Sequence, residues 1–117
     1  MVTHKDLDIW KMGMDLVEKV YRITQAFPKD ELFGLIAQIR RAAVSVPSNI
    51  AEGAARNSKK EYLQYLYISL GSLSEIETQI LISQRLGYQN DPDILEQVEH
   101  LRRKLLNFIK YIKGKAV

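Results

Sequence analysis

Apolar side chains recur at alternating intervals of three and four residues along this chain, and this periodicity restricts its fold more than any other property. Three short interruptions, at residues 27–30, 56–58 and 87–92, divide the pattern into four segments. No run alternates apolar and polar residues between turn signals, as a strand would. Connections this short make consecutive helices fold back on one another. The sequence predicts an all-α fold: an antiparallel up-and-down four-helix bundle that forms one domain over residues 1–117.

The first expected helix, from about Asp6 to Phe27, has more apolar positions than one buried face needs, which is nearer three positions in seven. We therefore expect a second side of this helix to be covered. Two neighbouring rows run along it: Leu7, Trp10, Met14, Val17, Tyr21 and Thr24, and beside them Ile9, Met12, Leu16, Val20, Ile23 and Phe27.

The second expected helix, from about Glu31 to Arg56, contains Pro47. Proline cannot donate a backbone hydrogen bond to the carbonyl of Ala43, so this pattern predicts a kink near Ala43 or a break in the helix. Many residues of this segment are small, which predicts that another helix approaches it closely. They are Ala42, Ala43, Ser45, Ser48, Ala51, Gly53, Ala54 and Ala55.

The third and fourth expected helices have recognisable ends. Ser58 and Glu61 form a capping-box pattern, Gly87 is a typical stop signal, and Asp91 is placed to cap the last helix. Gly71 lies inside the third helix, where glycine costs roughly 1 kcal/mol relative to alanine. Close contact with another helix is the simplest reason for a glycine at that position.

The chain offers little material for catalysis. It contains no cysteine, which excludes disulfides, thiolate metal sites and cysteine nucleophiles, and only two histidines. No Glu-x-x-His pair, phosphate-binding loop or nucleophile elbow occurs, so we expect no catalytic residues, no metal, no cofactor and no enzymatic activity. Because no long apolar stretch and no signal peptide are present, we expect a cytoplasmic protein without membrane contact.

Polar residues gather in the otherwise apolar second helix at Ser45, Asn49 and Glu52. Spacings of four and three place these side chains on one helix face. A structural interpretation is that they form a short hydrogen-bond network that fixes the helix beside Pro47. The alternative is that they bind a ligand or a partner. The sequence leaves both interpretations open and favours the structural one.

The formal net charge is only +3, but cations are clustered. In the last helix acids precede bases, and no acid follows Glu99. Complementarity to the helix dipole explains part of this order, although six cations exceed what the dipole needs. The clusters predict electrostatic, sequence-tolerant binding of RNA or DNA, because no aromatic platform is evident among the cations. The candidate residues are Arg40, Arg41, Arg56, Lys59 and Lys60, which we expect to cluster, together with Arg102, Arg103 and Lys104.

Several stretches resemble one known family. They are residues 6–11, 27–28, 38–53, 58–62, 71–75 and 86–88, of which the stretch from Gln38 to Gly53 is the most specific. The chain resembles, from about Asp6 to Ile112, the four-helix-bundle family encoded in intervening sequences of bacterial 23S ribosomal RNA genes, often labelled the S23 ribosomal protein family.

This resemblance implies a four-helix bundle that assembles as a homopentamer, and it supplies no catalytic residues. It does not imply a structural component of the ribosome. The accessory variability protein of diversity-generating retroelements is a similar pentamer that binds nucleic acid and the reverse transcriptase. We therefore expect a non-enzymatic oligomeric module that binds RNA or DNA. The alternative is a scaffold that binds a partner protein and no nucleic acid.

Overall fold

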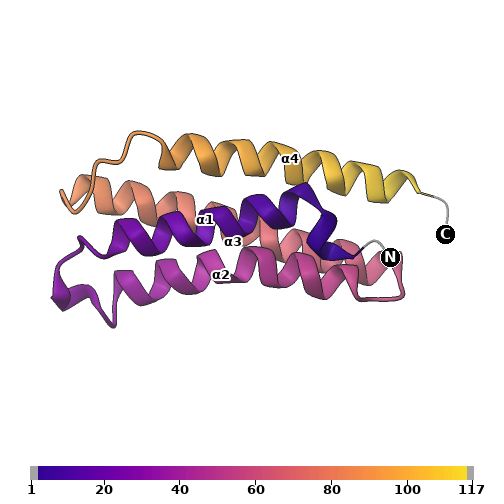
Figure 1. Ribbon diagram of the computed structural model, residues 1–117, viewed down its shortest axis with the longest axis horizontal. Coiled ribbons are helices and arrows are strands. Elements are labelled where there is room, and N and C mark those ends of the chain that lie inside the picture. The colour runs from indigo at the N-terminus through magenta and orange to yellow at the C-terminus, as the bar shows by residue number, and fades with distance from the viewer. Residues whose placement is uncertain (1–2, 116–117) are drawn as a thin grey trace.

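The computed structural model describes residues 3–115, and these fold into four long helices without any strand. The helices are α1 (Asp8–Thr24), α2 (Leu35–Ala54), α3 (Lys59–Arg85) and α4 (Ile94–Gly114). Two short 3-10 turns, η1 (His4–Asp6) and η2 (Lys29–Glu31), precede α1 and α2. The helices lie side by side in a body of 48 × 23 × 22 Å (Figure 1). The four-helix all-α fold predicted from the sequence is confirmed.

Contacts between elements show how the helices are arranged. Asp91, just before α4, pairs with Lys19 near the end of α1, with 3.0 Å between Nζ and Oδ2. Lys59, the first residue of α3, donates from Nζ to the carbonyl of Lys115, just past the end of α4, at 2.8 Å. The chain reverses at each connection, so that each helix runs back along its predecessor (Figure 1).

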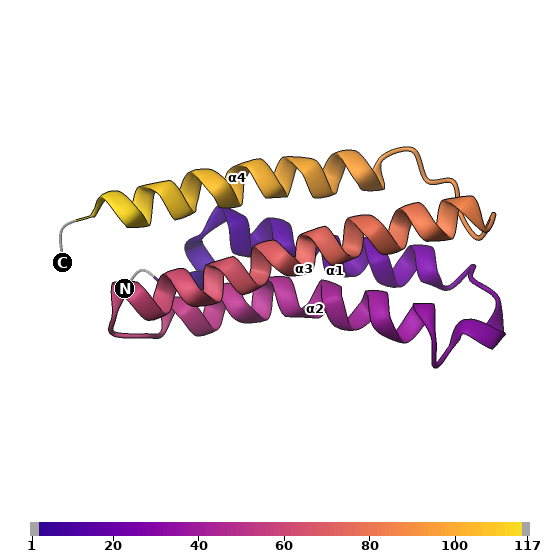
Figure 2. The same ribbon diagram turned by 180° about the vertical axis from the view of Figure 1, so that it is seen from behind.

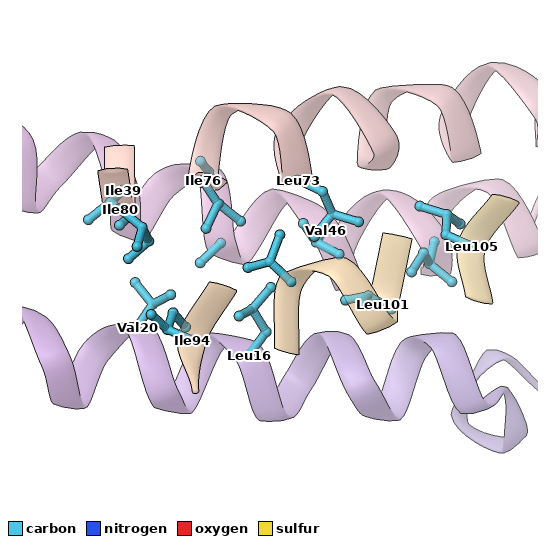
Figure 3. Packing of buried hydrophobic residues seen from close by; sticks show 14 of the residues in the cluster. Leu16, Val20, Ile39, Val46, Leu73, Ile76, Ile80, Ile94, Leu101 and Leu105 are labelled. Carbon is cyan, nitrogen blue, oxygen red and sulfur yellow. The ribbon is translucent and has the colours of Figure 1, made fainter. Parts of the chain in front are cut away.

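The core is a single cluster of apolar side chains from all four helices. Leu16 and Val20 of α1 meet Ile39 and Val46 of α2 there (Figure 3). Most of the apolar side chains that repeat at intervals of three and four along the last three helices are buried as well, whereas Tyr62 and Phe108 are half-buried and Leu32, just before α2, is exposed. The other two helices, α3 and α4, supply Leu73, Ile76, Ile80, Ile94, Leu101 and Leu105 to the region that Figure 3 shows.

On α1 the two apolar rows differ in burial. The row with Ile9, Leu16 and Val20 faces the core, whereas Met14 and Tyr21 of the other row are exposed. The excess of apolar positions on this helix therefore leaves an apolar face at the surface of the single chain. That another chain covers this face stays a prediction.

Helix α2 starts later than expected, at Leu35, because η2 and a turn occupy the preceding residues. The Glu31 carboxylate accepts the backbone N–H of Leu35 at 3.1 Å and the hydroxyl of Tyr88 at 2.9 Å, which ties the start of α2 to the α3–α4 connection. The helix continues through Pro47, so the alternative of a break is wrong. The kink stays a prediction.

Two glycines mark close contacts between helices. A Cβ on Gly53 would lie 2.9 Å from Cδ1 of Tyr62 and 2.9 Å from Cβ of Tyr65, as expected from the small residues of α2. A Cβ on Gly13 would lie 3.3 Å from Cβ of Pro47, so α1 also approaches α2 closely at the proline. Gly71 is different: a Cβ there would meet nothing within 4 Å. The expectation that Gly71 permits close helix contact is wrong within one chain.

The helix ends follow the sequence signals in most respects. Ser58 Oγ accepts the Glu61 N–H at 3.1 Å, and Gly87 has a φ of 75° just after α3. Helix α4 starts at Ile94, and Asp91 Oδ1 accepts the N–H groups of Asp93 and Ile94 at 2.9 and 3.0 Å. Across the described part of the chain, no helix is long and apolar enough to span a bilayer.

Candidate nucleic-acid interface

Arg40 and Arg41 lie near the start of α2 but differ in surroundings. The Arg40 guanidinium donates to Thr24 Oγ1 at 2.8 Å and lies 4.5 Å from the centre of the Tyr21 ring. This side chain therefore joins α2 to the end of α1. Arg41 is exposed and is the one of the pair that faces solvent.

Arg56, Lys59 and Lys60 lie at the opposite end of α2. Sixteen residues separate Arg40 from Arg56, which corresponds to a distance on the order of 20 Å along a helix. The prediction that these five cations form one cluster is therefore wrong, because the length of α2 places them at two ends of the bundle.

The three cations expected to act together in α4 also separate. Arg102 pairs with Glu77 of α3 at 3.4 Å and with Glu99 at 3.3 Å, so neighbouring carboxylates neutralise its charge. Arg103 and Lys104 are exposed and line a surface hollow to which Arg102 does not contribute. Consecutive residues on a helix point about 100° apart, which explains the separation.

A cationic pocket lies between the α2–α3 connection and the end of α4. It encloses about 310 Å³. Both views of the molecule place the end of α4 beside this connection (Figure 1, Figure 2). Three cations line the pocket, and none of its described lining residues is acidic. The lining consists of Arg56, Asn57, Ser58, Lys59, Tyr62, Ile112 and Lys115.

The side chain of Arg56 is held at the rim of this pocket. It lies 4.9 Å from the centre of the Tyr65 ring, donates to the Tyr65 hydroxyl at 2.7 Å and pairs with Glu52 at 3.1 Å. Tyr65, followed by Glu52, raises the pKa of Arg56. Burial raises the pKa of Tyr62, so this phenol stays neutral near pH 7. Glu52 offsets the charge of Arg56, so Lys59 and Lys115 give the pocket its net positive charge.

Aromatic rings are interleaved with the cations, contrary to the expectation from the sequence. The Lys115 ammonium lies 5.3 Å from the centre of the Tyr111 ring, and Lys113 lies equally close to the ring of Tyr67. Sequence reasoning missed these pairs because the tyrosines and cations meet only across α3 and α4 or a turn apart on α4. The i, i+4 spacing of Tyr111 and Lys115 was the available signal.

The polar cluster of α2 acts mainly within the fold. Asn49 Nδ2 donates to the carbonyl and hydroxyl of Ser45 at 2.8 and 2.9 Å, and the Ser72 hydroxyl of α3 bonds to Ser45 Oγ at 2.9 Å. Glu52 is exposed and pairs with Arg56 instead, so it does not join this network. These contacts favour the structural interpretation of Ser45 and Asn49, as packing between α2 and α3.

An acidic hollow of about 430 Å³ lies between α1 and the first half of α4. Its lining includes Asp15, Asp93, Glu96 and His100. Within residues 3–115, however, no three His, Cys, Asp or Glu side chains are grouped so that they could hold a metal ion.

The fold and the cationic pocket at one end define a class of protein: a small all-α bundle with a cationic end. The chain belongs to the family of 23S rRNA-intervening sequence proteins, whose family model matches residues 5–113. The role of this family is not clear, and it is not known as a family of enzymes. No protein with a curated description matches the sequence.

Proposed function

We propose that this protein is a non-enzymatic, self-associating bundle that binds RNA or DNA by electrostatic attraction. The observation that carries the proposal is the set of exposed cations on the second half of α4, where no acid follows Glu99. Arg103, Lys104, Lys110, Lys113 and Lys115 belong to this set, and half-buried Lys59 and exposed Lys60 lie at the nearby start of α3. Arg40 and Arg102 contribute less, because both are engaged within the fold.

Binding of this kind depends on salt for a physical reason. Each phosphate that a lysine or arginine neutralises releases a condensed counterion, so affinity falls as salt rises. A protein with several phosphate contacts loses orders of magnitude in affinity between 50 and 200 mM salt. We expect the same steep fall for this protein with a structured RNA.

The experiment measures binding to a fluorescent RNA hairpin by anisotropy at both salt concentrations. The triple variant Arg103→Ala, Lys104→Ala and Lys110→Ala should weaken binding at 50 mM salt by about ten-fold or more and reduce the salt slope by up to about three. The matched control removes the same charge elsewhere through Lys11→Ala, Arg22→Ala and Lys29→Ala, all exposed. Equal losses in the two variants, or no binding at 50 mM salt, would contradict the proposal.

Self-association is the second part of the proposal. An apolar hollow of about 400 Å³ lies between α1 and α2, and no charged residue is among its lining residues. They are Trp10, Met14, Val17, Val44, Pro47, Ser48 and Ala51. Phe33, before α2, is 93% exposed. Apolar surfaces of this kind on small proteins are typical of association sites.

The resemblance to the family implies five copies. Sedimentation equilibrium should therefore give a mass five times the 13.5 kDa of one chain. A ring of copies would repeat the cationic end and so strengthen binding that one copy makes weakly. A mass equal to one chain at high protein concentration would contradict this part of the proposal.

The alternative function is a scaffold that binds a protein partner without nucleic acid. The exposed side chain of Phe33 favours it, because an aromatic side chain at a loop tip is a typical anchor in protein interfaces. Assembly without any RNA or DNA binding at 50 mM salt would support this alternative over the first proposal.

A further inference from the structure

We propose that the cationic end binds a single-stranded stretch of nucleic acid, with a phosphate in the pocket and the neighbouring unpaired base stacked on Tyr111. This inference rests on the proposed function and deepens it, since it names the form of nucleic acid that this end of the bundle recognises. The pocket, its cations and one exposed aromatic ring carry the argument.

The pocket has the chemistry of a phosphate site. Arg56, Lys59 and Lys115 line it from three elements: the α2–α3 connection, the start of α3 and the residue after α4. The hydrogen bond from Lys59 Nζ to the Lys115 carbonyl holds two of these elements together. Ser58 and Lys59 also place the N-terminus of the long helix α3 at the pocket, which adds the attraction of its dipole for an anion.

Tyr111 provides an exposed ring beside this pocket. The side chain is 59% exposed, and Lys115, which lines the pocket, lies over the ring. The ring of Phe108 packs against Tyr111 with 6.0 Å between centroids, and against the pocket residue Tyr62 with 5.9 Å. These two contacts link Tyr111 through Phe108 to Tyr62 of the pocket, while the Tyr111 ring itself lines a neighbouring hollow.

This arrangement favours an unpaired strand over a duplex. Bases inside a duplex are stacked on each other, so a protein ring can stack only on bases that are splayed out. Proteins that bind single strands combine a cationic groove with aromatic rings, and each stacked base contributes substantially to affinity. The pocket and Tyr111 supply both parts without any base-reading side chain, which predicts tolerance of sequence.

The test compares Tyr111→Ala with the unmodified protein, using a fluorescent single-stranded oligouridine and a blunt duplex of equal length at 50 mM salt. The variant should bind the single strand about ten-fold more weakly and the duplex within two-fold of the original affinity. Tyr111→Phe should retain single-strand binding, because stacking needs the ring and not the hydroxyl. Circular dichroism shows whether each variant is folded.

Tyr67→Ala is the matched control. Tyr67 is also an exposed tyrosine with a lysine over its ring, but that lysine, Lys113, does not line the pocket, whereas Lys115 over Tyr111 does. Its loss should leave single-strand binding within two-fold. Equal weakening by Tyr67→Ala, no weakening by Tyr111→Ala, or equal effects on single strand and duplex would each overturn the inference. If the duplex still binds in a salt-dependent way, the proposed electrostatic binding of nucleic acid stands without the single-strand inference. If neither nucleic acid binds, the proposed function and the single-strand inference both fail.

Discussion

Gly53 controls how closely α3 can approach α2. The positions that a Cβ would contact are Cδ1 of Tyr62 and Cβ of Tyr65, and the Tyr62 carbonyl lies only 3.2 Å away. The Cβ of Tyr65 and the carbonyl of Tyr62 are fixed to the backbone of α3, so they cannot move aside without moving the helix, whatever the Tyr62 ring does. The side chain of Tyr62 also lines the cationic pocket, which links the packing at Gly53 to the site.

We predict that Gly53→Ala lowers the free energy of unfolding by about 1–3 kcal/mol, the usual cost of overpacking a close contact. Gly71→Ala is the control, because a Cβ there meets nothing within the chain and alanine favours the helix by up to about 1 kcal/mol. Urea unfolding followed by circular dichroism, at equal protein concentration, measures both. A gain in stability from Gly53→Ala would show that the two helices separate easily.

At the residue scale, the sequence predicts local helix-end signals better than it predicts which residues contact one another across helices. It correctly marks Ser58 and Gly87 as helix ends, because these signals act within a few neighbouring residues. It treats Arg40 and Arg102 as free cations, although each has partners on another helix. Partners that lie 16 or 25 residues away leave no local pattern in one sequence.

The start of α4 depends on one carboxylate. Asp91 accepts two backbone N–H groups and pairs with Lys19 of α1, so it both caps the helix and joins it to α1. Desolvation opposes ionisation there, but the hydrogen bond from Lys19 and those from the backbone outweigh it and lower the pKa of Asp91. The ionised carboxylate therefore stabilises the folded state.

This gives a pH prediction with a definite sign. A carboxyl whose pKa is lowered by folding contributes stability above its unfolded pKa, about 3.9 for aspartate, and that contribution disappears as pH falls through the folded value. Acidification from about pH 5 to pH 3 should therefore destabilise the original protein more than Asp91→Asn, which keeps a capping oxygen but not the charge. Urea midpoints at the two pH values measure this difference.

The control for this prediction is Asp93→Asn, which changes the same charge two residues away, where the side chain is exposed. It should leave the acid-dependent loss of stability close to that of the original protein. If Asp91→Asn and Asp93→Asn behave alike, the ion pair with Lys19 adds nothing to the stability of the start of α4.

At the scale of elements, the four periodic segments are predictable because an amphipathic helix repeats its pattern over many residues. The choice between the two apolar rows of α1 is not predictable in the same way. Both rows fit a helix, and only packing against the other helices selects Leu16 and Val20 for the core. The Glu31 carboxylate that accepts the Leu35 N–H at the start of α2 also accepts the hydroxyl of Tyr88 from the α3–α4 connection, a contact that leaves no local pattern in the sequence.

At the scale of the whole molecule, two surface features take no part in the packing of the core. One is the cationic end, with Lys59 and Lys115, and the other is the apolar hollow between α1 and α2, with Met14 and Val44. The sequence predicts that both exist but not that they are separate. Because they lie on different parts of the bundle, association through the hollow would leave the cationic end of each copy open to nucleic acid.

This separation predicts the behaviour of a variant that blocks association. Val44 is 41% exposed at the apolar hollow, and burying a glutamate there against a second copy would cost several kcal/mol without a partner charge. Val44→Glu should therefore reduce the mass in sedimentation equilibrium to that of one chain, with an unchanged circular dichroism spectrum. Binding to a long RNA should weaken much more than binding to a short oligonucleotide, because only the former can engage several copies. Leu106→Glu on α4, similarly exposed but outside the hollow, is the control and should keep the mass of the assembly. If the Val44→Glu protein also keeps that mass, this hollow is not the interface between copies.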